Sequence, residues 1–177
     1  MRVVGKVLLN TLIAIAILAA LSFALPGSIK VERSITVNAA PEKIFPHLND
    51  LRKFKAWSPW TPREPKATYD FTGSDEGVGQ IMMWSSETGE AGSGTMEIIE
   101  SEENRLVRAA LDFGERGWAN STFVLESEGS STKVTWGFET EFGNNPLRRW
   151  MGLMLDRWIG ADYEEGLKRL KQTVETA

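Results

Sequence analysis

The chain has 177 residues, a formal net charge of −4, no cysteine and a single histidine. This length leaves room for one folded domain of ordinary size beside an apolar N-terminal segment. The acidic balance disfavours a nucleic-acid partner, because affinity for phosphate requires clustered lysine and arginine. The lack of cysteine excludes disulfides, thiolate metal sites and a cysteine nucleophile, and one histidine excludes a histidine-rich metal cluster. We therefore expect neither a metal nor a cofactor.

An apolar segment without charged side chains covers residues 7–25, and Pro26 follows it directly. It is long enough to cross a bilayer as a helix, which takes about 20 residues. Arg2 and Lys6 precede it, which places the N-terminus in the cytoplasm by the positive-inside rule. The alternative is a cleaved signal peptide and a secreted domain, since Ser22-Phe23-Ala24 has small residues at cleavage-site spacing. We prefer the uncleaved anchor because of the length of the apolar run. The predicted division is a cytoplasmic tip at 1–6, an anchor at 7–25, a linker at 26–29 and an extracytoplasmic domain at 30–177.

The next part of the chain alternates between patterns typical of strands and of short helices. Period-two alternation predicts a strand at 30–37. Two short helices follow, one starting near Pro41 and one running from Asn49 or Asp50 towards Ala56. Prolines then predict a loop at 61–66. Six further strands with short turns are predicted at 67–71, 78–84, 95–100, 105–113, 118–126 and 132–142, with a glycine-rich turn at 88–94. Such a meander forms an antiparallel sheet that buries one face.

A long helix is predicted from Asn145, a good capping residue, and Pro146, which tolerates the first helical position. Carried to Glu175, it would extend roughly 45 Å at about 1.5 Å per residue. Its apolar face consists of Leu147, Met151, Leu155, Ile159, Tyr163 and Leu167, with Trp150, Met154 and Trp158 on the adjacent row. We expect the sheet to cover this face.

Three glycines interrupt this helix, each costing about 1 kcal/mol relative to alanine in an exposed helix interior. For Gly166 we expect close packing against strands. For Gly152 and Gly160 the sequence does not distinguish close packing from space left for a ligand.

Several local motifs occur in a characteristic order. They are Asn38-Ala39-Ala40-Pro41-Glu42-Lys43-Ile44-Phe45, Trp57-Ser58-Pro59-Trp60, Gly77-Val78-Gly79, Gly92-Ser93-Gly94, Thr132-Lys133-Val134-Thr135-Trp136 and Ile159-Gly160-Ala161-Asp162-Tyr163-Glu164-Glu165-Gly166-Leu167. The ordered set resembles the polyketide cyclase/dehydrase branch of the START and pollen-allergen superfamily, over about residues 30–175. The resemblance implies an α+β helix-grip fold, in which a seven-stranded antiparallel sheet curls around the C-terminal helix and leaves a cavity for an apolar small molecule. It implies a fold and a pocket and does not imply an activity.

Motifs of catalysis are sparse. The sequence contains no Gly-x-Ser-x-Gly elbow, no phosphate-binding loop with lysine, no His-Glu-x-x-His and no dinucleotide fingerprint. His47 has no identifiable aspartate or nucleophile partner, so we favour a partly buried or surface histidine over a catalytic one. Asp112, Tyr69 and Tyr163 are the candidates for an acid or base, and together with Gln80 they are polar residues that could orient a ligand.

Aromatic and methionine side chains are abundant, with seven tryptophans and six methionines. Such residues suit an apolar binding surface, although they also fill ordinary cores. The expected cavity lining is Trp57, Trp60, Met82, Trp84, Met96, Phe113, Phe123, Trp136, Phe138, Trp150, Met154 and Trp158. In the long helix we expect residues 150–159 to form a wall and gate of the cavity, and residues 167–174 to close the core. Arg148, Arg149 and Arg157 suit either contact with anionic lipid head groups or a solvated helix face.

Three functional hypotheses follow. The first is a membrane-tethered domain outside the cytoplasm that holds an apolar small molecule or lipid. The second is a cyclase- or dehydratase-like enzyme that uses the same cavity. The third is a structural or interaction domain whose own side chains fill the cavity. The pattern predicts no oligomeric state.

Overall fold

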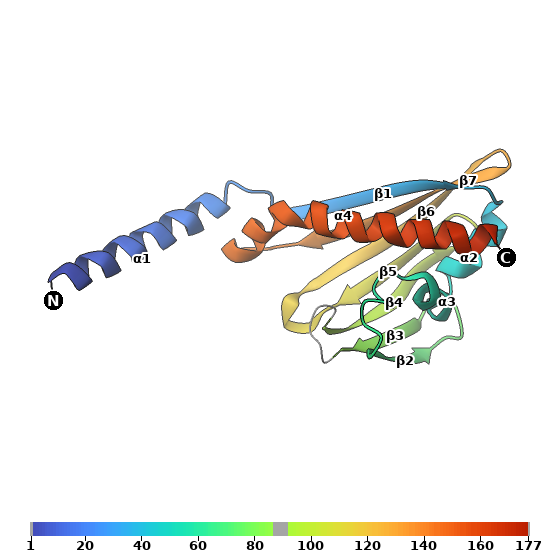
Figure 1. Cartoon of the computed structure of the whole chain (residues 1–177), viewed down its shortest axis with the longest axis horizontal. Helices are drawn as coiled ribbons and strands as arrows, with labels where there is room; N and C mark the ends of the chain where they lie inside the picture. The colour runs from blue at the N-terminus through green and yellow to red at the C-terminus, as the bar shows by residue number, and fades with distance from the viewer. Residues whose placement is uncertain (1, 87–91, 177) are drawn as a thin grey trace.

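A curved sheet of seven antiparallel strands surrounds a long helix in the computed structural model, which describes residues 2–86 and 92–176 (Figure 1). The elements are α1 (Arg2–Ser22), β1 (Ser28–Val37), α2 (Pro41–Leu48), α3 (Leu51–Trp57), β2 (Thr68–Gly73), β3 (Gln80–Ser85), β4 (Ser93–Glu102), β5 (Leu106–Asp112), the 3-10 turn η1 (Gly114–Arg116), β6 (Trp118–Glu128), β7 (Ser131–Glu141) and α4 (Pro146–Glu175). The predicted fold class and element order are confirmed. The predicted glycine-rich turn falls largely at residues 87–91, outside the described residues.

The strand order in the sheet is β1-β7-β6-β5-β4-β3-β2, so the first strand pairs with the last. The register aligns Val31 with Phe138 and Phe123 with Trp136, which places these side chains on the same concave face. All four are buried, whereas Thr122 and Val124 beside Phe123 are more exposed, as are Thr135 and Glu139 on β7. Period-two alternation therefore builds the core on one face, as predicted.

The two short helices close one end of the sheet. The Asp50 side chain accepts a hydrogen bond from the Arg52 backbone N–H and caps α3. Gln80 ties the helix to β3, because its Oε1 accepts from the Leu51 N–H at 2.7 Å and its amide donates to the Asp75 carbonyl at 2.6 Å. Gln80 is fully buried in this network, so it is a structural link and does not orient a cavity ligand.

Helix α4 behaves differently in its two halves. Asn145 caps it by accepting from the backbone N–H groups of Leu147 and Arg148. The C-terminal half closes the core as predicted, with the side chains of Leu167, Leu170 and Val174 buried.

The first half of α4 does not bury its large apolar side chains, so the prediction that the sheet covers the whole apolar face is wrong there. Leu147 is 68% exposed and Met154 is 52% exposed. The reason is that small residues form the side of the helix that meets the domain. A Cβ at Gly152 would meet the Phe142 ring at 2.6 Å, and one at Gly160 would meet the Arg33 guanidinium at 2.0 Å. Close approach on the glycine side turns the large side chains away from the sheet.

Gly166 packs closely, as predicted, since a Cβ there would lie 2.6 Å from the Trp136 ring and 3.1 Å from Pro59. Gly166→Ala should gain about 1 kcal/mol of helix propensity but introduce about 1–3 kcal/mol of overpacking, and we expect a net loss of stability. Urea unfolding of the full chain in detergent micelles measures this change in the free energy of unfolding. Ala161→Gly, at an exposed position of the same helix, gives the intrinsic difference between the two residues. A Gly166→Ala protein that gains as much stability as Ala161→Gly loses would contradict close packing.

Helix α1 extends away from the sheet (Figure 1). Its segment Val4–Ser22 is long and apolar enough to cross a membrane. Nearly all of this segment is exposed, and Ser22 at its end is buried. A signal sequence meets the same criteria of length and composition. Three points therefore stay predictions. They are that α1 is retained as an anchor, that its N-terminus lies in the cytoplasm, and that the chain divides into the four parts given above.

Candidate ligand-binding cavity

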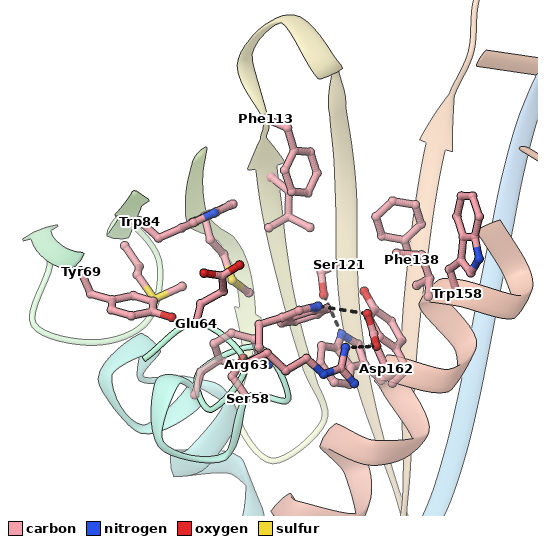
Figure 2. A pocket seen from close by; sticks show the side chains of 18 of the residues that line it. Ser58, Arg63, Glu64, Tyr69, Trp84, Phe113, Ser121, Phe138, Trp158 and Asp162 are labelled. Carbon is pink, nitrogen blue, oxygen red and sulfur yellow. Dashed lines mark hydrogen bonds and ion pairs between the residues drawn. The ribbon is translucent and has the colours of Figure 1, made fainter. Parts of the chain in front are cut away.

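A cavity of about 650 Å³ lies between the concave face of the sheet, helix α4 and the segment that follows α3 (Figure 2). The lining residues come from every strand except β1, from helices α3 and α4, from the loop after α3, and from the connection between β5 and β6 that contains η1. They are Phe54, Ser58, Trp60, Arg63, Glu64, Tyr69, Met82, Trp84, Met96, Leu111, Phe113, Arg116, Ser121, Trp136, Phe138, Trp158, Ile159, Asp162 and Tyr163. Most of the wall is aromatic or aliphatic.

Most of the residues expected at the cavity lie on its wall. They are Trp60, Met82, Trp84, Met96, Phe113, Trp136, Phe138 and Trp158, together with Tyr69 and Tyr163. Sheet geometry explains this grouping, because Met82 pairs with Met96 across β3 and β4 and the side chains of paired residues share a face.

Four residues expected at the cavity do not line it. Trp57 and Phe123 are buried in the layer behind Trp136, with ring centroids 5.4 Å and 4.9 Å from it. Trp150 instead donates from Nε1 to the Leu18 carbonyl of α1 at 3.2 Å. The Met154 side chain is half-exposed. The α4 wall therefore begins at Trp158, near the end of the predicted span of 150–159, and continues to Tyr163.

A rigid aromatic layer forms one side of the cavity. The Trp136 and Tyr163 rings stack with centroids 3.7 Å apart and planes 11° apart, and Trp136 Nε1 donates to Ser121 Oγ at 2.8 Å. Burial raises the pKa of the Tyr163 phenol well above its usual value, with a smaller opposing effect from Ser121. A phenol held neutral in this way is poorly matched to proton transfer near neutral pH.

Three of the four charged lining residues, Arg63, Glu64 and Asp162, gather on the side of the cavity beside the loop after α3, and the fourth, Arg116, comes from η1. Arg63 Nη1 lies 2.5 Å from Asp162 Oδ1, and Arg63 Nη2 lies 2.5 Å from Glu165 Oε2. Trp60 Nε1 donates to the other Asp162 oxygen at 3.1 Å, and Ser86 Oγ donates to Glu64 Oε2 at 2.6 Å. The hydrogen bond to Asp162 raises the pKa of Arg63. Figure 2 shows Arg63 beside Ser58 and Asp162, with Phe113 on the other side of the cavity.

Local patterns in the sequence do not identify these polar residues as part of the cavity wall. Ser58, Arg63 and Glu64 lie in an irregular proline-rich segment, where no periodicity indicates which side chain points inward. One signal in the sequence indicates a polar residue at the cavity wall. Asp162 lies one helical turn after Trp158 and directly before Tyr163, and both of these were expected at the cavity.

The remaining acid–base candidates have distinct environments. Asp112 is exposed, does not line the cavity, and accepts from the Gly114 backbone N–H at 2.8 Å, which shapes the turn after β5. Tyr69 lines the cavity, and the Lys55 ammonium lies 4.3 Å from its ring centroid. Over the described ranges, no group of three or more His, Asp or Glu side chains is placed to hold a metal ion.

His47 is half-buried in α2, away from the cavity lining, and its backbone carbonyl accepts from Trp57 Nε1. Burial, followed by the charge of Lys53, lowers the pKa of its imidazole below 6.5. Because the unfolded chain then takes up this proton at higher pH than the folded chain, the free energy of unfolding should fall as pH drops through 6.5. His47→Gln should show a weaker fall, measured by urea unfolding at a series of pH values. Equal pH dependence in both proteins would contradict this account.

A sheet curled around a long helix, with an apolar cavity between them, defines the helix-grip class of ligand-binding domains. Within that class, residues 28–175 match the family described as polyketide cyclase / dehydrase and lipid transport, and the chain belongs to this family. A comparison with curated protein sequences gives no match.

Solved structures of low sequence identity share the fold. Ara h 8.0201 has a TM-score of 0.61 at 16% identity, covering 85% of this chain and 100% of its own. Truncated norcoclaurine synthase from Thalictrum flavum has a TM-score of 0.62 at 14% identity, covering 83% and 93%. The Aha1 dimer from Colwellia psychrerythraea has a TM-score of 0.55 at 21% identity, covering 83% and 96%. At these identities the likeness extends to the fold alone.

Proposed function

We propose that this chain is a membrane-tethered binding protein that holds an apolar small molecule or lipid in the cavity beside α4. The observation that carries the proposal is the cavity itself. Its volume of about 650 Å³ lies in the range of about 300–1,000 Å³ typical of small-molecule sites, and its wall is mainly apolar. The family description, which includes lipid transport, supports the same class of ligand.

The polar groups of the wall suggest how a ligand is oriented. Ser58, Arg63 and Asp162 cluster on one side, while Trp84, Phe113 and Phe138 supply apolar surface (Figure 2). A ligand with an apolar body and one hydrogen-bonding group satisfies both regions, because a buried polar group requires a partner. This proposal favours amphiphiles over pure hydrocarbons.

The tether is α1. In the proposed topology the N-terminus lies in the cytoplasm and the binding domain lies outside it. Cleavage after the Ser22-Phe23-Ala24 segment would instead release the same domain as a secreted protein.

The observations favour binding over catalysis. Asp112 points away from the cavity, and Tyr163 is a buried, stacked phenol with a raised pKa. A domain filled by its own side chains is also disfavoured, because the tryptophans and methionines leave the cavity open.

Photocrosslinking tests the proposal with the full chain in lipid nanodiscs. A long-chain fatty acid that carries a diazirine is added, irradiated, and its adducts are mapped by peptide mass spectrometry. Helix α1 serves as an internal reference for contact with bulk lipid. We expect adducts on cavity residues of β3 and β4, such as Met82 and Met96. Labelling confined to α1 and the surface would overturn the proposal.

A further inference from the structure

The first half of α4 carries an apolar patch that no described residue covers fully. Leu147, Met151, Met154 and Trp158 share one side of the helix, opposite Gly152 and its close contact with Phe142. Their exposed fractions are 68%, 46%, 52% and 48%. A contiguous set of large exposed apolar side chains marks an interaction surface.

This α4 patch adjoins the point where α1 leaves the domain. Trp150 Nε1 donates to the Leu18 carbonyl at 3.2 Å, and Arg149 Nη1 donates to the Leu25 carbonyl at 3.1 Å. The Arg149 guanidinium also lies 5.1 Å from the centre of the Phe23 ring. Leu18 belongs to the segment that is apolar enough to cross a membrane. With α1 in a bilayer, the first turns of α4 are therefore held at the lipid interface, where tryptophan is favoured.

The same end of the domain adds a second apolar element. Arg148 Nη2 donates to the Glu115 carbonyl at 2.7 Å and so joins α4 to η1. Thr140 Oγ1 donates to the Trp118 carbonyl at 2.6 Å. Two residues further along the chain, the Phe142 N–H donates to the Gly27 carbonyl, in the linker that follows α1. Trp118 is 50% exposed. Trp118 therefore lies at the end of the domain from which α1 extends.

The charges around the patch suit lipid head groups. Arg148 and Arg149 hydrogen-bond to backbone carbonyls, which carry no net charge. The carboxylate of Asp156, by contrast, is paired with Arg33 on the side of α4 that faces β1. Guanidinium groups beside an exposed apolar helix face are typical of helices that lie in a membrane interface.

We propose that the α4 patch and Trp118 dock the domain on the bilayer that holds α1, so that the cavity exchanges its ligand directly with the lipid. Trp158 belongs to both the patch and the cavity wall. In Figure 2, Phe113 and Trp158 lie on the side of the cavity away from Arg63 and Ser58. The apolar body of a ligand would thus face the bilayer and its polar group the charged side. The inference rests on the proposed membrane tether.

Site-directed spin labelling tests the docking, since the chain has no cysteine and any introduced one is unique. Met154→Cys probes the patch. Val78→Cys is the matched control, because Val78 is an apolar residue of 56% exposure. It lies in the turn between β2 and β3, at the end of the sheet opposite Trp118. Ile13→Cys reports whether α1 is in lipid. The full-length variants are placed in nanodiscs of phosphatidylcholine and phosphatidylglycerol, and each label's accessibility to oxygen and to a water-soluble nickel complex is measured.

We expect the label at 154 to favour oxygen over nickel, as the label at 13 does, and the label at 78 to show the reverse. A label at 154 as accessible to nickel as that at 78 would overturn docking. Shielding at 154 from both reagents would overturn it in favour of a second copy of the chain. If the label at 13 is accessible to nickel, α1 does not lie in the bilayer, and both the proposed tether and the proposed docking are contradicted. Lipid immersion at 154 without diazirine labelling of the cavity would support docking and contradict the binding function.

Discussion

Replacing Trp136 with alanine should lower the free energy of unfolding by about 3–5 kcal/mol, the usual cost of truncating a large buried aromatic residue. Trp136 is 1% exposed and contacts rings on both sides of the domain. It stacks on Tyr163 of α4 and on Phe123 of β6, and it meets Trp57 of α3 edge to face. Its loss would also leave Ser121 without the indole N–H that now donates to it. One side chain therefore joins the sheet, α3 and α4.

The test is urea unfolding of the full chain in detergent micelles, with tryptophan fluorescence as the readout of unfolding. Trp118→Ala is the matched control, because Trp118 is half-exposed, and its substitution should change stability by no more than about 0.5 kcal/mol. Trp136→Phe should lose less than Trp136→Ala, since it keeps part of the stack. A Trp136→Ala protein no less stable than Trp118→Ala would contradict the role assigned to this aromatic layer.

Local signals in the sequence predicted the elements well. The Asn145 cap and Pro146 placed the start of α4, and alternation along β5 to β7 placed the concave face. These features depend on neighbouring residues alone, which is why one sequence suffices. The cavity-facing strand residues follow from the same period of two.

Other features depend on contacts between distant segments. Alternation shows that Trp57 and Phe123 point inward, but it does not distinguish the cavity wall from the layer behind it. The periodicity of Leu147, Met151 and Met154 shows an apolar face without showing what covers it. Arg63 and Asp162 meet only because the loop after α3 folds onto α4, across nearly a hundred residues of sequence. No local pattern encodes such a meeting.

Replacing Leu111 with tryptophan should make the cavity smaller and weaken ligand binding. Leu111 is partly buried on the concave face of β5 and lines the cavity. A larger side chain in a packed core costs about 1–3 kcal/mol, but here the added ring has open space of about 650 Å³ to enter. We therefore expect a folded protein with a smaller cavity. Loss of about 1.4 kcal/mol of ligand affinity corresponds to a tenfold weaker interaction, and we expect at least about that loss.

Leu106→Trp is the matched control. Leu106 lies on the same strand, on the face opposite to that of the buried Val107 and Ala109. The same change on the outer face adds an equal ring without touching the cavity wall. Both variants should retain the cooperative unfolding of the parent chain.

The most direct measurement is diazirine labelling of Met82 and Met96 in the parent chain, Leu111→Trp and Leu106→Trp, each normalised to labelling of α1 in the same nanodiscs. The account predicts cavity adducts in the parent chain and in Leu106→Trp, and at least about a tenfold loss of them in Leu111→Trp, in line with the affinity loss above. Equal labelling of β3 and β4 in all three proteins, with every variant folded, would contradict the claim that the ligand occupies this cavity.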